Sequence, residues 1–329
     1  RQLHMCIRYR IWAIQFNRLA ASNTHTGIYT GTSRVHNGAA GAGPSMAMMD
    51  TFQCTDGKPI SESELYDWQN PWKNRDPRLD LYCVRSGSRT MGIQFSTDPA
   101  DKTVYDYISG TSVTNSDVTG NKSEYGPNGI QGPGGFLWRK FCDPAYYGSI
   151  TGTGYEDELD VPIIRLAELL LIDAEANIEW DGGDLARAKS QIDRVRARVK
   201  MPPVEGSSRE ALRSALRYER KVELCAEGFR WFDIRRWKIA SKAVNGPMYA
   251  PGYSTVQNPG NYISNVRPSF DDDWVVTYDL SDTWDGKTGN LRVFQTMVFN
   301  PEKDYLWPIP YTELVTNPAI GVENQNPGY

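Results

Sequence analysis

Three glutamates spaced four residues apart lie in the segment from Glu219 to Asp233, and arginines lie on both sides of them. Glu219, Glu223 and Glu227 share one face of a helix, because residues four apart lie one above another. Paired carboxylates are the groups that glycoside hydrolases use as acid and nucleophile. The alternative is a partly buried ion network, which is the commoner role of carboxylates inside helices. The density of arginines favours the network.

Further charged residues lie on a predicted helix that is otherwise apolar and runs from about Asp160 to Trp180. Charges on such a helix must be paired if they are buried. We predict a structural ion network and no catalytic residue. The predicted members of the network are Arg165, Glu168, Glu175, Glu219, Arg220, Glu223, Glu227 and Arg236.

A second group of residues with suitable chemistry is the aromatic turn, which we define as residues 66–72 (YDWQNPW). Tyr66, Trp68 and Trp72 supply three rings, and Asn70 is one of the polar residues between them. This mixture suits an amphipathic sugar, which offers both C–H faces and hydroxyl groups. The same rings also suit a small hydrophobic cluster that pins a long loop. Both interpretations stay open at this point.

Other kinds of site find little support in the sequence. The three histidines are scattered, and neither Gly-x-Ser-x-Gly nor His-Glu-x-x-His occurs. The five cysteines form no Cys-x-x-Cys pair, which argues against zinc and iron–sulfur sites. Asp271–Asp273 lacks the spacing of a calcium-binding loop, so we interpret it as an acidic loop. We predict no metal and no cofactor, and the net charge of −4 argues against nucleic acid as a partner.

Four helices are predicted to position the charged residues, with Gly or Pro between most of them. Asp160 is the predicted cap of the first helix, with Pro162 in its first turn. Antiparallel pairing with short turns follows from the short connections. The predicted helices cover residues 160–180, 184–200, 208–228 and 229–243.

The remaining sequence is rich in Gly, Pro and Asn, which predicts loops around these helices. Apolar spacing also predicts a helix within residues 3–20. A short helix is expected within 45–54, and short strands within 81–110. Long loops are expected over 110–135 and 245–300.

Several segments of the chain, in this order, resemble the SusD/RagB family, the surface lipoproteins of Bacteroidetes that capture glycans. These segments are RDPR (75–78), VPIIRLAE (161–168), ERKVELCAEGFRWFD (219–233), YLWPIP (305–310) and QNPGY (325–329). The resemblance implies a mainly α fold with tetratricopeptide-like paired helices, long irregular loops and a few short strands. It also implies that residues 1–329 form a single domain and correspond to the C-terminal part of the family. The lipoprotein signal and the first helical pairs of the family are not visible in this sequence.

The resemblance further implies non-catalytic capture of an oligosaccharide or polysaccharide and its delivery to a SusC-like TonB-dependent transporter. The expected location is the extracellular face of the outer membrane, reached through an N-terminal lipid anchor that this sequence does not include. The alternatives are a peptide-capturing relative, a helical protein-binding scaffold or, with less support, a glycoside hydrolase.

In this family the glycan site is a surface patch built by loops. The candidate contacts in this sequence come from the loop 29–37 and from the aromatic turn. They are Tyr29, Arg34, Tyr66, Trp68, Asn70 and Trp72.

Overall fold

The computed structural model describes residues 10–16, 43–85, 87–90, 92–96, 101–115, 136–140, 160–251, 264–317 and 319–329. Tyr29 and Arg34 lie outside these residues. None of the helices within the described ranges combines the length and the apolar character that crossing a membrane requires.

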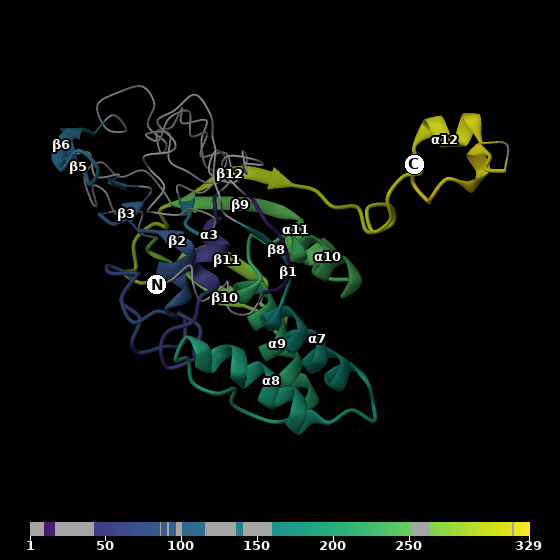
Figure 1. Ribbon diagram of the computed structural model, residues 1–329, viewed down its shortest axis with the longest axis horizontal. Helices are drawn as coiled ribbons and strands as arrows, with labels where there is room; N and C mark the ends of the chain where they lie inside the picture. The colour runs from purple at the N-terminus through teal and green to yellow at the C-terminus, as the bar shows by residue number, and fades with distance from the viewer. Residues whose placement is uncertain are drawn as a thin grey trace.

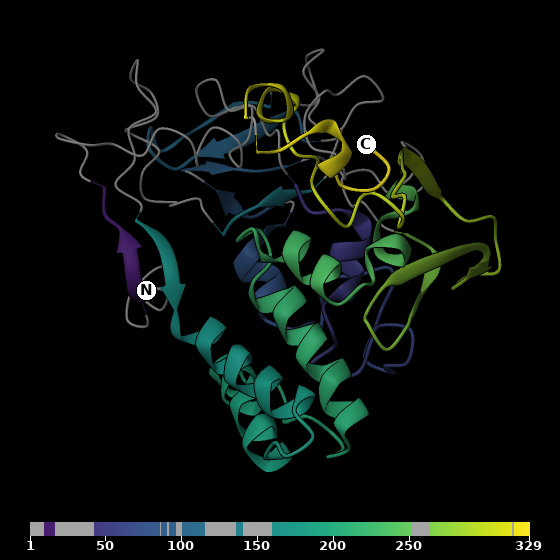
Figure 2. The ribbon, with the colours of Figure 1, turned by 90° about the vertical axis from the view of Figure 1, so that its right-hand side faces the viewer.

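Three helices pack together in the lower part of Figures 1 and 2: α7 (Leu166–Glu179), α8 (Leu185–Arg198) and α9 (Arg209–Glu223). Asp184 caps α8 and Ser208 caps α9, since both side chains accept hydrogen bonds from backbone N–H groups in the first turn. The apolar faces of the three helices meet in one buried cluster. Its members are Leu171, Ala174, Ile178, Ala188, Ile192, Val195, Val204, Leu212, Leu216 and Leu224.

The prediction of a helix within residues 3–20 is wrong for the part that the structure describes. Residues Arg10–Ile14 form strand β1, which pairs antiparallel with β8 (Val161–Arg165). The following helix, α7, therefore starts only at Leu166, and Pro162 lies in a strand rather than in a first helical turn. Three β-branched residues in the Val161–Arg165 strand favour the extended backbone, and the strand is paired on one edge only, where a proline is tolerated.

The single helix predicted over 229–243 is divided in the structure. Helix α10 (Phe229–Arg236) ends before Lys238, whose φ of 59° is incompatible with a continuous helix, and α11 (Ala240–Val244) follows. The preceding helix, α9, ends at Glu223, and Gly228 caps α10 with a φ of 87°.

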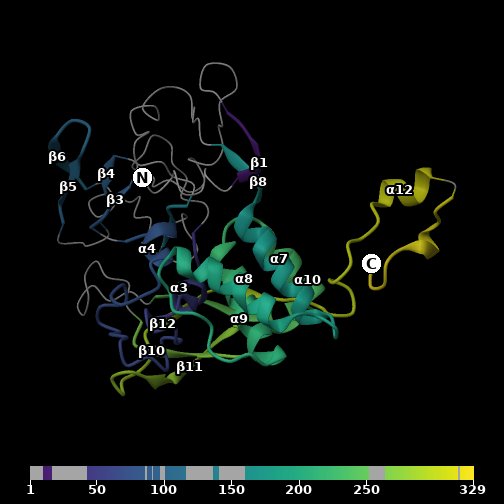
Figure 3. The same cartoon turned by 60° about the horizontal axis from the view of Figure 1, so that its bottom comes forward.

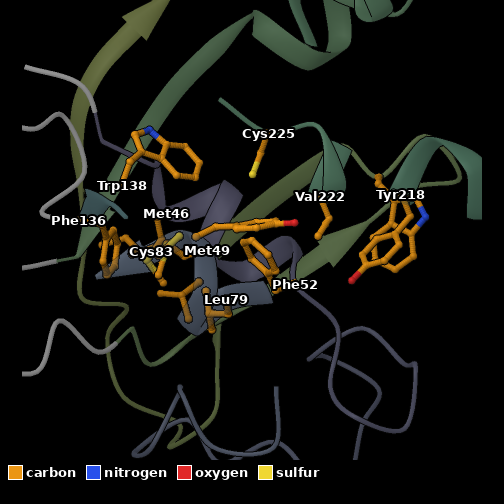
Figure 4. Packing of buried hydrophobic residues seen from close by; sticks show 14 residues of the cluster. Met46, Met49, Phe52, Leu79, Cys83, Phe136, Trp138, Tyr218, Val222 and Cys225 are labelled. Atoms are coloured by element: carbon orange, nitrogen blue, oxygen red, sulfur yellow. The ribbon is translucent and has the colours of Figure 1, made fainter. Parts of the chain in front are cut away.

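Two short helices place the Arg-Asp-Pro-Arg turn against α9. Helix α3 (Met46–Thr51), the short helix expected within 45–54, buries Met46 and Met49. Helix α4 (Arg78–Tyr82) leads into strand β2 (Cys83–Val84), which pairs with β7 (Leu137–Trp138). The cluster in Figure 4 joins these elements to α9 and to the strands that follow it, and Cys225 lies in it at 5% exposure. The buried members are Met46, Met49, Phe52, Leu79, Tyr82, Cys83, Phe136, Trp138, Tyr218, Val222, Cys225, Val266, Trp274 and Leu291.

The described residues form twelve strands in five small sheets, more than the few that the sequence predicts. One antiparallel sheet has the order β3-β4-β5-β6. Its strands are β3 (Arg89–Thr90), β4 (Ile93–Gln94), β5 (Thr103–Asp106) and β6 (Thr111–Thr114).

The loop prediction for residues 245–300 is wrong, because two strand pairs occupy much of this range. Strand β9 (Gly246–Pro251) pairs with β12 (Leu291–Met297), and β10 (Val266–Phe270) pairs with β11 (Val276–Thr283). The partners β9 and β12 are far apart in sequence, so no local sequence pattern predicts their pairing.

The C-terminal segment contains α12 (Tyr311–Thr316) and the short 3-10 helix η1 (Val322–Asn324). Figures 1 and 3 show α12 apart from the packed helices and sheets. The chain leading to it is held by Phe299, which is buried among residues of α10 and α11.

Candidate functional site

Glu219 and Glu223, in the C-terminal part of α9, are fully buried, and each binds more than one cation. The Glu219 carboxylate accepts hydrogen bonds from Arg78 at 2.6 Å and from Arg196 at 2.7 Å. Arg78 is itself fully buried and also binds Asp76 at 2.6 Å. The Arg-Asp-Pro-Arg turn is thereby fastened to the middle of α9.

Glu223 lies one helical turn further along α9 and is held by three arginines. Its carboxylate accepts hydrogen bonds from Arg165 at 2.8 Å, from Arg198 at 2.7 Å and from Arg78 at 3.2 Å. Burial alone would raise the pKa of Glu223, but these arginines more than offset it and hold the pKa well below its usual range. Arg165 also binds Glu227 at 2.6 Å, and Lys140 binds Glu227 at 2.5 Å.

We call this group the inner network. It ties β8, α4, α8 and α9 together through five cations and four carboxylates. Its members are Arg78, Lys140, Arg165, Arg196, Arg198, Asp76, Glu219, Glu223 and Glu227.

Three of the four remaining predicted network residues, Glu175, Arg220 and Arg236, belong to a separate group around Asp233 of α10. Arg220 binds both oxygens of Asp233 at 2.9 Å, and Arg236 joins Asp233 to Glu175 of α7. Glu168 departs from the prediction, because it forms no ion pair with another described residue. Its Oε2 is buried without a hydrogen-bond partner, and burial raises the pKa of its carboxyl group.

The burial of the α9 carboxylates argues against their use as the acid and nucleophile of a glycoside hydrolase. A general acid must reach the substrate and hold a proton near neutral pH. Glu219 and Glu223 have no exposed surface, and the pKa of Glu223 is lowered rather than raised. The carboxylates of α9 therefore have the environment of structural ion pairs.

The aromatic turn is fixed to the body by Arg75. This guanidinium group is buried and donates hydrogen bonds to the backbone carbonyls of Met49, Phe52 and Pro71. It also lies 5.4 Å from the ring centroid of Tyr66. The turn is consequently held in one conformation before any ligand arrives.

The three rings of the turn have different surroundings. Trp72 packs against the cluster of Figure 4, and Tyr66 lies 5.3 Å from the ring of Trp284. Trp68 is half-buried and is not among the rings packed against the buried clusters of the described residues. The exposed Asn70 is oriented by a hydrogen bond to Asp67 at 2.7 Å. Trp68 and Asn70 are thus the members of the turn that are best placed to meet a ligand.

Trp284 is a neighbour of the turn that the sequence analysis missed. It follows strand β11, and the guanidinium group of Arg267 on β10 lies 4.4 Å from its ring centroid. An Asp-Gly pair is a turn signal, so Asp285-Gly286 could have marked the place where the chain turns after this residue. The signal was lost because residues 245–300 were interpreted as loops.

The acidic loop is engaged by basic side chains. Lys242 binds Asp271 at 2.6 Å and also pairs with Asp273, which in turn pairs with Arg217. Within the described ranges, no group of three or more His, Cys, Asp or Glu side chains is arranged to hold a metal ion.

Comparisons with known proteins agree with this architecture. A sequence model of the SusD family matches residues 10–329. SusD-like protein P2 from Formosa agariphila is 29% identical over 192 residues, which cover 56% of this chain and 29% of that protein. A SusD-like carbohydrate binding protein from Bacteroides fragilis matches with a TM-score of 0.65 and 25% identity, covering 93% of this chain and 53% of its own.

A second structure, a SusD-like protein from the same species, has a TM-score of 0.61 and 23% identity, and covers 98% of this chain and 54% of its own. The chain thus spans about half the length of the solved relatives and less of the curated one. The SusD-like fold expected from the sequence is confirmed by these structures. The family match extends over nearly all residues, and this chain belongs to the SusD family.

Proposed function

We propose that this protein captures an oligosaccharide or polysaccharide without cleaving it. The observation that carries the proposal is its membership of the SusD family together with its similarity to a Bacteroides fragilis protein described as carbohydrate binding. The absence of catalysis is supported by the buried, arginine-bound carboxylates of α9. Those groups cannot approach a glycosidic bond without unfolding the inner network.

The aromatic turn is the proposed glycan contact. Trp68 offers a ring for stacking on a sugar face, and the Asn70 amide suits hydroxyl groups. Trp72 packs against the buried cluster and Tyr66 against Trp284, so these rings hold the turn in position. Trp284 also extends the aromatic surface beside Tyr66. Tyr29 and Arg34 stay in the proposal as contacts from a loop outside the described residues.

The proposal includes a place for the protein in the cell. The captured glycan is delivered to a SusC-like TonB-dependent transporter at the extracellular face of the outer membrane. A lipid anchor at the N-terminus of a longer chain would hold the protein there. In that longer chain, residues 1–329 form the C-terminal part of one domain, and α7, α8 and α9 belong to a tetratricopeptide-like scaffold.

Affinity electrophoresis tests the proposal with gels that contain soluble starch, xylan, laminarin, pullulan, galactomannan or alginate. We expect retardation by at least one polysaccharide and no released sugars on chromatography. Trp68→Ala should abolish most of the retardation. Trp180→Ala is the matched control, because it removes another ring, 68% exposed at the end of α7, that lies outside the aromatic turn.

Three results would contradict parts of this proposal. Released sugars would establish a hydrolase. Retardation that survives Trp68→Ala would move the site away from the aromatic turn. No retardation in any gel, together with saturable binding of a peptide library, would favour the peptide-capturing alternative.

A further inference from the structure

The hairpin of strands β5 and β6 carries a second exposed aromatic surface, which we call the tyrosine hairpin (residues 103–114). Tyr105 and Tyr107 are each 40% exposed, and their ring centroids lie 5.0 Å apart at an interplanar angle of 74°. Val104 and Ile93 fill the opposite face of the sheet at 1% and 4% exposure. The two rings are therefore outward residues of a sheet whose other face is already packed.

The tyrosine hairpin is rigid at its tip. The Asp106 carboxylate accepts a hydrogen bond from the Ile108 N–H at 2.8 Å, and the Gly110 N–H bonds back to the Asp106 carbonyl at 3.0 Å. Gly110 has a φ of 71°, which lets the chain turn there. The Tyr105 hydroxyl donates to the Gly110 carbonyl at 3.1 Å. Little conformational freedom is left for a ligand to remove.

The groups around the rings match the chemistry of a sugar. The Arg89 guanidinium group lies 4.9 Å from the ring centroid of Tyr107, and exposed Ser109 and Thr111 place two hydroxyl groups 2.9 Å apart. Ser112 is directly opposite Tyr105 in the strand register. Hydroxyl groups and a cation thus surround the two rings, and Ile108 is the exposed aliphatic residue of this hairpin.

The tyrosine hairpin and the aromatic turn lie on the same side of the molecule. Figures 1 and 3 place the blue β5–β6 hairpin and the dark-blue loop that holds the aromatic turn on the left, opposite α12. One long chain can therefore run from one surface to the other without encircling the protein.

We propose that the tyrosine hairpin is a second carbohydrate contact, which binds the same polysaccharide chain as the aromatic turn at another point along it. This inference rests on the proposed function. A polymer that occupies both contacts gains affinity, because its second contact forms at a high effective concentration. A short oligosaccharide that occupies only one of them gains nothing.

The test compares polymer with fragment on the full chain. For each of the six polysaccharides that retards the wild-type protein, the dissociation constant is measured for the polymer and for short oligosaccharides made from it by partial acid hydrolysis. In the double variant Tyr105→Ala, Tyr107→Ala, affinity for the polymer should fall about tenfold. Affinity for the fragments should not change. Tyr311→Ala, which removes an exposed tyrosine ring from α12, should change neither value.

Each other outcome overturns the inference in a recognisable way. An unchanged affinity for the polymer would show that the hairpin does not touch the glycan. An equal loss for polymer and fragments would make the hairpin part of a single site. A wild-type dimer in sedimentation that the double variant abolishes would assign the rings to a second copy of the chain. Failure of the wild-type protein to bind any of the six would instead be a failure of the proposed function.

Discussion

Replacing Glu223 by Gln removes one negative charge from the centre of the inner network while keeping nearly the same shape. Glu223 is fully buried, and three arginines donate hydrogen bonds to it. After the change, three carboxylates remain to balance five cations, and the amide nitrogen of Gln must face an arginine. The variant therefore leaves positive charge buried without its partner, which is the costly way to alter an ion network.

The expected loss of stability is about 3–5 kcal/mol, the range for breaking a buried pair from one side. A chain of 329 residues has an unfolding entropy of about 0.7 kcal/mol/K, so this loss lowers the Tm by roughly 4–7 °C. The matched control is Glu179→Gln. Glu179 pairs with Arg213 at 2.7 Å, but the Glu179 side chain is 43% exposed, so its loss should cost less than about 1 kcal/mol.

Urea denaturation followed by circular dichroism measures both variants beside the wild-type protein. The pH dependence supplies a second check. The folded-state pKa of Glu223 lies below its unfolded value of 4.5, so its stabilisation is present above that pH and is lost as the pH falls further. The difference between wild type and Glu223→Gln should therefore shrink below about pH 4. Equal stability of Glu223→Gln and Glu179→Gln at pH 7 would refute the structural role of the inner network.

Two further predictions concern stability elsewhere in the chain. Burial raises the pKa of Asp50 to about 6, although the hydrogen bond from Tyr278 acts to lower this pKa. Ionisation of Asp50 therefore destabilises the fold increasingly between about pH 4 and pH 6. Asp50→Asn keeps an acceptor for Tyr278, and in urea titrations it should stabilise the protein by up to about 3 kcal/mol at pH 8 and by nothing near pH 3.5. The same difference in stability at both pH values would exclude this account. Gly183→Ala should destabilise by roughly 1–3 kcal/mol, because its Cβ would overlap the backbone carbonyl oxygen of Asn177. Gly182→Ala, whose Cβ meets only an exposed aromatic side chain, should cost less, and a larger loss for Gly182→Ala would contradict the assigned contacts.

The features that the sequence predicted well are local. The starts of the second and third helices, near residues 184 and 208, and the four-residue repeat of glutamates are predicted from patterns that extend over one or two helical turns, and the structure has helices there. The partners of Glu219 and Glu223 that the sequence did not assign include Arg78, Arg196 and Arg198. Arg78 lies 141 and 145 residues away from the two glutamates.

The features that failed depend on contacts between distant segments. The apolar residues of strand β1 are spaced in a way that also fits a helix. Its backbone is extended because it pairs with β8, a contact with a distant segment that the spacing does not show. The β9–β12 pair likewise joins Gly246 to Met297 across a range that is rich in loop-forming residues. The aromatic turn was marked as a candidate by its composition, whereas its neighbour Trp284 comes close only through the fold of a separate hairpin.

The position of Arg75 connects the stable core to the proposed binding surface. Its guanidinium group fastens the aromatic turn to α3 through Pro71 on one side and Met49 and Phe52 on the other. These hydrogen bonds go to backbone carbonyls, so they place no requirement on the side chains of Trp68 and Asn70. Those two residues can therefore change while the contacts of Arg75 stay the same. Arg75→Lys keeps the charge but loses the planar set of donors that holds the turn. This variant still contains Trp68, yet it should weaken glycan binding as much as Trp68→Ala does. Unchanged binding in that variant would show that the turn holds its conformation without Arg75.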